Sequence, residues 1–188
     1  MTDILDLHKY FLSGHLKKGG ACADFTMGNG HDTKFLSEAV YESEENPGHV
    51  YAFDIQPAAL SSTEKLLKES GCPANVELIL DSHEFAAKYI HEPLCAGVFN
   101  LGWLPGAGDK SVTTRCSSTI PAIETALSLL DSNGILLVAV YPGHEEGEKE
   151  GKAVYDLLSS LERHTYGVYH VKIANSPRAP FFFAVEKK

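Results

Sequence analysis

Short apolar runs alternate with longer amphipathic stretches along almost the whole chain. Most of these runs are apolar at successive positions, which is typical of strands that are buried on both faces of a parallel sheet. The runs predict strands at 21–25, 49–54, 76–80, 96–101, 134–141, 167–173 and 180–186. The amphipathic stretches predict helices at 33–43, 57–70, 82–90, 117–130 and 145–162.

This alternation predicts a single domain over residues 1–188 with a doubly wound, Rossmann-like α/β sandwich. The last two strands are separated only by the stretch around ANSPRAP (174–180), which is too short for a crossover helix. That pair is therefore expected to be antiparallel, within a seven-stranded sheet that is otherwise mostly parallel. Gly134 follows the helix at 117–130 and is expected to cap its carboxyl end.

The composition, with 44% hydrophobic and 22% charged residues, is that of an ordinary globular protein. No window approaches the roughly 18 apolar residues that span a bilayer. The N-terminal stretch has acidic residues among its apolar ones, unlike a signal peptide. We therefore expect a cytoplasmic protein without membrane contact. The four cysteines are widely spaced, which predicts reduced thiols and neither a metal site nor a disulfide framework.

The formal net charge of −9 opposes non-specific binding to nucleic acid, which depends on clustered basic residues. A local basic patch is still compatible with that charge, provided that the fold brings distant residues to one rim. The candidates for such a rim are Lys17, Lys18, Lys34, Lys110, Arg115 and Arg178. A homodimer would bring two sets of these residues together.

The stretch GNGHDT (28–33) lies between the first predicted strand and the helix that follows it. Gly28 and Gly30 tolerate unusual dihedral angles and a close approach of the backbone to a ligand, while Asn29 and Asp32 add hydrogen-bonding side chains. The third glycine of a dinucleotide fingerprint is missing, and so is a phosphate-binding loop. Asp24 and Asp32 would repel a pyrophosphate but suit a cationic amino-acid ligand.

The next two strands also end in acidic residues. Asp54 is placed to accept hydrogen bonds from both hydroxyls of an adenosine ribose. Asp81, Ser82 and His83 end the third strand, where they could contact an adenine. A glycine turn followed by acids at two successive strand ends resembles the S-adenosylmethionine site of class I methyltransferases. The alternative is that GNG is only a turn and that the acids cap helices.

The fourth strand leads into FNLGWLPGAGDK (99–110), where NLGW resembles a substrate motif of class I amine methyltransferases, with Leu101 and Gly102 in place of two prolines. Asn100 would orient the N–H bonds of an amine, and Trp103 would either stack on an unpaired base or pack the loop. In YPGHEEGEKE (141–150), Tyr141 and His144 are candidates for substrate contact, and His144 could accept a proton. The glutamates there more simply favour a helix N-terminus.

Together, DFTMGNGHDT, NLGWLPGAGDK and YPGHEEGEKE resemble a bacterial family described as putative rRNA methylases and associated with methylation of 5-aminomethyl-2-thiouridine at the tRNA wobble position. The resemblance implies S-adenosylmethionine as cofactor, the anticodon region of tRNA as partner, and methyl transfer to an exocyclic amine. It also implies roles for particular residues: Gly28, Asn29, Gly30 and Asp32 at the methionine end, Asp54 and Gln56 at the ribose, Ser82 and His83 at the adenine, and Asn100 at the substrate.

Two features depart from that family. Phe25 stands where a small residue is usual, which is expected to alter only strand packing, and ANSPRAP replaces a stretch richer in Asn and Pro. A methyltransferase acting on rRNA or a small molecule, or a non-catalytic domain that binds S-adenosylmethionine, are the alternatives. The remaining histidines are dispersed and are expected to be surface or packing residues: His8, His15, His49, His91, His164 and His170.

Overall fold

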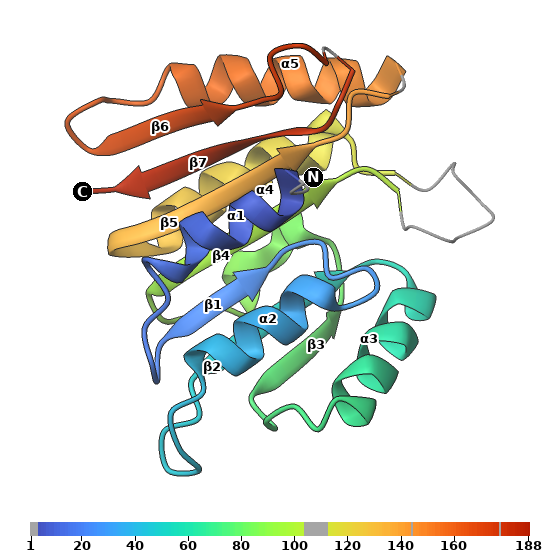
Figure 1. Ribbon diagram of the computed structural model, residues 1–188, viewed down its shortest axis with the longest axis vertical. Coiled ribbons are helices and arrows are strands. Elements are labelled where there is room, and N and C mark those ends of the chain that lie inside the picture. The colour runs from blue at the N-terminus through green and yellow to red at the C-terminus, as the bar shows by residue number, and fades with distance from the viewer. Residues whose placement is uncertain (1–3, 104–112, 144, 177) are drawn as a thin grey trace.

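Every apolar run predicted as a strand forms one in the computed structural model, which describes residues 4–103, 113–143, 145–176 and 178–188. The strands are β1 (Ala21–Asp24), β2 (His49–Asp54), β3 (Val76–Leu80), β4 (Leu94–Leu101), β5 (Leu130–Val140), β6 (Tyr166–Val171) and β7 (Phe181–Lys187). They form one sheet in the order β3-β2-β1-β4-β5-β7-β6 (Figure 1).

The strand directions agree with the sequence pattern. β1 pairs in parallel with both β2 and β4, and the pairs β2–β3 and β4–β5 are also parallel. β7 runs antiparallel to both of its neighbours, β5 and β6. The predicted doubly wound sheet with an antiparallel C-terminal strand is therefore confirmed.

Helices cover both faces of this sheet (Figure 1). They are α1 (Ile4–Ser13), α2 (His31–Val40), α3 (Pro57–Glu69), η1 (His83–Lys88), α4 (Cys116–Leu129) and α5 (Glu145–Ser159). The helices α1 and α2 pack their apolar residues on one face, whereas η1, α4 and α5 pack on the other. The amphipathic pattern predicted all of these helices except α1, and η1 is a short 3-10 helix.

The expected helix cap at Gly134 is wrong, because this residue lies inside β5. The helix α4 instead ends at Leu129, and its C-cap Leu130 already has an extended backbone. A Cβ on Gly134 would lie 2.9 Å from the carbonyl oxygens of both Asp131 and Leu94. The glycine thus allows close approach between β5 and β4, at the point where the register between these strands shifts.

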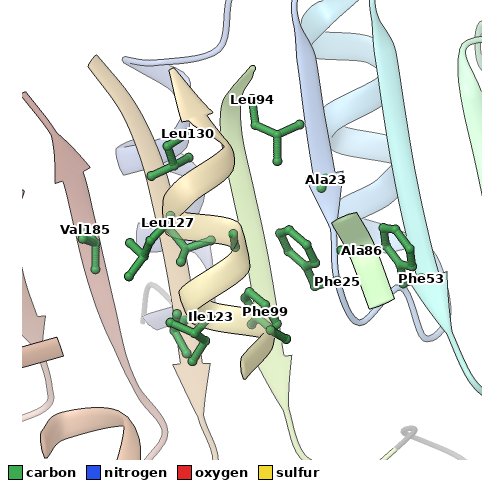
Figure 2. Close-up of a cluster of buried hydrophobic side chains, with 14 of the residues drawn as sticks. Ala23, Phe25, Phe53, Ala86, Leu94, Phe99, Ile123, Leu127, Leu130 and Val185 are labelled. Carbon is green, nitrogen blue, oxygen red and sulfur yellow. The ribbon is translucent and has the colours of Figure 1, made fainter. Parts of the chain in front are cut away.

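The ring of Phe25 lies between those of Phe53 and Phe99, near the carboxyl ends of β1, β2 and β4, and all three side chains are buried (Figure 2). The Phe25 ring stacks on Phe99 with 4.4 Å between centroids, and it lies parallel to the Phe53 ring at 5.9 Å. A Cβ on Gly97 would lie 3.0 Å from the Phe25 ring. The large residue at position 25 is therefore accommodated by a glycine on the neighbouring strand.

Candidate active site

A cavity opens at the carboxyl ends of β1 to β4, the edge where ligands bind in open α/β sheets. Its lining includes most of the site residues predicted from the sequence: Gly28, Asp54, Gln56, Asp81, Ser82, His83, Asn100 and Trp103. Tyr141 also lines it. Asn29 and Gly30 belong to the adjoining turn, Asp32 lies in the first turn of α2, and His144 lies outside the described residues.

The turn after β1 has the backbone that its glycines permit. Gly28 and Gly30 have φ angles of 51° and 82°, in the left-handed region that favours glycine. Thr63 on α3 donates from its hydroxyl to the Gly28 carbonyl at 3.1 Å, and Ser62 donates to Asn29 Oδ1 at 3.0 Å. Two side chains of one helix thus fix the turn, which brings its backbone to the edge of the cavity.

Asp54 at the end of β2 holds the same turn from the other side. One of its oxygens accepts from Gly28 N at 3.1 Å and the other from Gln56 N at 2.9 Å. Burial raises the pKa of Asp54, and these backbone hydrogen bonds oppose the increase. Each oxygen retains a lone pair for a ligand hydroxyl. This geometry fits the predicted contact with a ribose.

His83 presents an unused acceptor in the cavity wall. Its Nδ1 lies 3.1 Å from the Phe25 carbonyl oxygen, to which it must donate. Burial lowers the pKa of His83, which favours the neutral ring and leaves a lone pair on Nε2. That Nε2 atom is buried and has no hydrogen-bond partner among the described residues. A ligand that donates an N–H, as the amino group of adenine does, would satisfy it.

Asp81 and Ser82 lie beside this histidine at the end of β3. Asp81 accepts from the Tyr89 hydroxyl at 2.9 Å and from Ser82 N at 2.8 Å. The hydroxyl of Ser82 caps η1, because it accepts from the Glu84 backbone N–H and donates to the Glu84 carboxylate. Both predicted residues therefore line the cavity with side chains that are already oriented.

Asn100 at the end of β4 is tied to the turn through Asp32. Its Nδ2 donates to Asp32 Oδ2 at 2.8 Å, and His8 Nε2 lies 3.2 Å from the other oxygen. Lys9 Nζ is 4.0 Å from that oxygen. Burial alone would raise the pKa of Asp32, but its hydrogen bonds and the charge of His8 hold it below its ordinary value. Asp32 is therefore a carboxylate with partners on both oxygens.

Asp24, the other acid of the turn, lies beneath the cavity with no exposed surface. It accepts from Thr26 N at 3.1 Å and from the Thr33 hydroxyl at 2.7 Å. Burial, reinforced by the nearby Asp32 charge, raises the pKa of Asp24 to about 7. Its role is thus to organise the turn from below.

Two acidic or basic side chains that shape the site were missed in the sequence. His8 was expected at the surface or in packing, yet it contacts Asp32; the signal was its position between Ile4 and Leu12, one helical turn from each, on the buried face of α1. Glu150 is buried in α5 and accepts from the hydroxyls of Thr114 at 2.7 Å and Thr119 at 2.6 Å. Thr114 lines the cavity, so Glu150 supports that wall.

Among the described residues, no group of His, Cys, Asp and Glu side chains is arranged to hold a metal ion. No helix in the described ranges has the length and apolar character needed to cross a membrane. The cavity does fit S-adenosylmethionine: it combines a glycine turn for the amino-acid end, Asp54 for a ribose and the open Nε2 of His83 for a base.

Known proteins resemble this chain in both sequence and structure. It is 33% identical over 182 residues to the chloroplast tRNA (mnm5s2U34) methyltransferase of Arabidopsis thaliana, an alignment that covers 92% of this chain and 65% of that protein. The crystal structure of a putative rRNA methylase from Clostridium thermocellum is 34% identical, with a TM-score of 0.94 over 100% of this chain and 99% of that one.

A second crystal structure addresses the cofactor. A putative methyltransferase from Streptococcus mutans, solved in complex with S-adenosylhomocysteine, is 37% identical with a TM-score of 0.88, over 100% of this chain and 99% of that one. S-adenosylhomocysteine is what S-adenosylmethionine becomes when its methyl group is transferred. The predicted cofactor is therefore supported by a relative that binds its product form.

The resemblance seen in the sequence motifs is confirmed by the family comparison. The model of the family described as Putative rRNA methylase matches residues 50–187, which is more than half of the chain. With the class I methyltransferase fold described above, the chain belongs to this Putative rRNA methylase family.

Proposed function

We propose that this protein transfers a methyl group from S-adenosylmethionine to the exocyclic amine of 5-aminomethyl-2-thiouridine at the wobble position of tRNA. The observation that carries the proposal is that the cavity joins the cofactor turn to Asn100, whose amide is held beside it by Asp32. The Arabidopsis relative is named for this tRNA position, which supports the choice of substrate.

The chemistry requires little more than positioning. S-adenosylmethionine supplies an electrophilic methyl group, and the amine nucleophile must be neutral and aligned at about 3 to 3.5 Å. Asn100 lines the cavity, where its side chain can accept an N–H of the amine and direct the nitrogen lone pair. The new N–C bond forms as the S–C bond breaks, and the amine then loses a proton to water or to a base. His144 remains a candidate for that base, beside water.

No covalent nucleophile is needed for methyl transfer to an amine. Methylation of a pyrimidine ring carbon generally requires a cysteine to add to the ring. Cys95 is buried on β4 and Cys116 begins α4, and neither lines the cavity. Burial raises the pKa of both thiols, which disfavours the reactive thiolate. The amine reaction is thus the better match to this cavity.

The basic residues at the same sheet edge support an RNA substrate despite the negative net charge. Arg115 precedes α4, Lys172 follows β6 and Arg178 leads into β7, so all three lie at the carboxyl ends of the parallel strands. They are exposed and make no ion pair with any described residue. Such cations are available to phosphate groups.

The wider basic rim expected from the sequence is not formed by all of its candidates. Lys17 pairs with Asp131 at 2.9 Å, and Lys18 donates to the Tyr41 carbonyl at 2.8 Å. Both lysines lie at the opposite, amino edge of the sheet. Lys34 pairs with Glu38, and Lys110 lies outside the described residues. A homodimer would bring a second set of cations and is the arrangement considered from the sequence.

Methyl transfer from labelled S-adenosylmethionine into total bacterial tRNA lacking the final wobble methylation tests the proposal, with nucleoside mass spectrometry as the readout. Conversion of 5-aminomethyl-2-thiouridine to its methylamino form is the expected result. Fully modified tRNA is the matched control and should take up no label. Cofactor binding by calorimetry without any label in tRNA would overturn the tRNA assignment and direct the search to rRNA or small amines.

A further inference from the structure

The side-chain amide nitrogen of Asn100 already donates a hydrogen bond within the protein. Its Nδ2 donates to Asp32 Oδ2 at 2.8 Å, and its backbone N donates to Thr26 Oγ1 at 2.6 Å. No described residue donates to Asn100 Oδ1, and that atom is not buried without a partner. Because Asn100 lines the cavity, its available group there is a hydrogen-bond acceptor.

Asp32 determines whether Asn100 presents its amide oxygen or its amide nitrogen to the cavity. A carboxylate only accepts hydrogen bonds, and the low pKa of Asp32, which burial opposes but His8 maintains, keeps it in that form. If the Asn100 amide were turned over, Oδ1 would face a carboxylate oxygen at the 2.8 Å now occupied by a hydrogen bond. Two acceptors would then repel each other. The orientation of the amide therefore depends on the charge of Asp32.

His8 in turn holds Asp32. This histidine is 2% exposed, on the face of α1 that also buries Ile4 and Leu12. Its Nε2 is 3.2 Å from Asp32 Oδ1, and it must donate because the carboxylate cannot. With Oδ1 held by α1, Oδ2 is left for Asn100. Both His8 and Asp32 lie outside the residues 50–187 that match the family.

We propose that His8 and Asp32 are positioning residues, which hold the Asn100 amide with its oxygen toward the cavity so that it accepts an N–H of the amine that receives the methyl group. The identity of that amine rests on the proposed function, whereas the orientation of the amide does not. Once the amine is neutral, a group that accepts one N–H and cannot donate favours the orientation in which the nitrogen lone pair points away from Asn100, toward the methyl donor.

An Asp32→Asn substitution tests the orientation directly, because the new amide can donate to Asn100 Oδ1 and so favour the turned-over form. We expect kcat to fall about 100-fold, as for other losses of alignment. Because Asp32 is also predicted to lie at the methionine end of the cofactor, kcat is measured at saturating S-adenosylmethionine, where a change in cofactor affinity does not contribute. The double variant Asp32→Asn/Asn100→Asp restores a carboxylate–amide pair with an acceptor in the cavity. Its kcat should be at least about tenfold higher than that of Asp32→Asn.

Substitutions of His8 separate positioning from packing. His8→Phe keeps an aromatic ring but loses the donor, and it should lower kcat about tenfold. His8→Gln, whose Nε2 can donate to Asp32, should restore most of that loss. His15→Phe is the matched control: this histidine lies after α1 and contacts the Asn133 carbonyl and Glu186, away from the cavity, so its kcat should equal that of wild type.

A nuclear magnetic resonance measurement reads the amide without any RNA. The side-chain N–H resonances of Asn100, assigned by their loss in Asn100→Asp, should shift in Asp32→Asn and His8→Phe but not in His15→Phe. Unchanged resonances and an unchanged kcat in Asp32→Asn would overturn the inference. Shifted resonances in Asp32→Asn and His8→Phe, together with a wild-type protein that methylates no tRNA, would instead overturn the proposed function alone.

Discussion

Gly30 and Thr63 lie in contact across the turn between β1 and α2, with no room for a further carbon atom. A Cβ on Gly30 would lie 2.7 Å from Thr63 Oγ1 and 3.0 Å from its Cα. Thr63 also donates to the Gly28 carbonyl at 3.1 Å. The contact links the glycine turn to α3 and so sets the path of the backbone beside the cavity.

Gly30→Ala should therefore weaken both the fold and the cofactor site. The left-handed φ of 82° costs an alanine about 1 to 2 kcal/mol. The crowding against Thr63 adds about 1 to 3 kcal/mol. We expect the free energy of unfolding, from urea denaturation, to fall by the sum of these terms. Calorimetry should show at least a tenfold loss of affinity for S-adenosylmethionine, because the turn must move away from α3.

Gly71→Ala is the matched control for this substitution. Gly71 also has a left-handed φ, of 64°, but a Cβ there would meet nothing within 4 Å. Only the backbone cost of about 1 to 2 kcal/mol should appear, with no change in cofactor affinity. Equal losses in the two variants would show that the contact with Thr63 does not matter.

Asp54→Asn should reduce cofactor affinity, although the two side chains have nearly the same size and shape. Asp54 accepts from Gly28 N at 3.1 Å and Gln56 N at 2.9 Å, and an amide can accept on only one of its two ends. The amide would therefore lose one of the two acceptor oxygens predicted to bind the ribose hydroxyls, and a hydrogen bond to a charged group contributes about 1.5 to 3 kcal/mol. The dissociation constant for S-adenosylmethionine should rise about 10- to 100-fold.

A carboxylate at the opposite edge of the sheet provides the comparison for Asp54. Asp131 pairs with Lys17 at 2.9 Å and is partly exposed to solvent. Asp131→Asn should leave cofactor affinity unchanged, since surface ion pairs contribute little and the residue lies far along β5 from the cavity. A wild-type affinity in Asp54→Asn would contradict the assignment of Asp54 to the ribose.

The order of strands and helices could be predicted because it depends on local patterns. Runs of apolar residues marked all of the strands, and the short connection before β7 marked its antiparallel direction. The start of β5 could not be predicted in this way. Gly134 follows a helical pattern, but its place in the strand depends on the approach of Leu94 from β4, which is a tertiary contact.

The same distinction applies to the site. Gly28, Asp54 and His83 follow directly from the ends of β1, β2 and β3, where the fold class places ligands. His8 could not be assigned, because only the packing of α1 brings it to Asp32, which lies in a different element. In the sequence, Glu150 cannot be told apart from the exposed glutamates of the same helix. Only the tertiary contacts with Thr114 and Thr119, whose hydroxyls donate to it, distinguish it.

Glu150 should accordingly contribute more to stability than its neighbours. Glu150→Ala would leave the hydroxyls of the partly buried Thr114 and the buried Thr119 without their acceptor, at about 1 to 3 kcal/mol for each. We expect urea denaturation to show a loss of about 2 to 5 kcal/mol in the free energy of unfolding. Glu148→Ala, on the exposed side of α5, should change it by no more than about 0.5 kcal/mol. Similar values for both would contradict the proposed support.

Asp24 should make the stability of the protein depend on pH in an unusual direction. Burial raises its pKa from 3.8 to about 7 in the folded protein. Below about pH 4 the carboxyl is protonated in both the folded and unfolded states, so it makes no difference there. As the pH rises to about 7, the unfolded chain releases this proton more readily than the folded one. The contribution of Asp24 to stability therefore falls across this window and stays constant above it.

Asp24→Asn removes this titration while keeping the local hydrogen bonds. The amide oxygen can still accept from Thr26 N, and the amide nitrogen can donate to Thr33, whose hydroxyl then accepts. Relative to wild type, the variant should gain stability between pH 4 and pH 7, by an amount on the order of 4 kcal/mol at the plateau. Urea denaturation of both proteins across this range measures the difference. Parallel stability curves would mean that Asp24 ionises as readily in the folded protein as in the unfolded chain, and that the acid beneath the glycine turn is not held neutral.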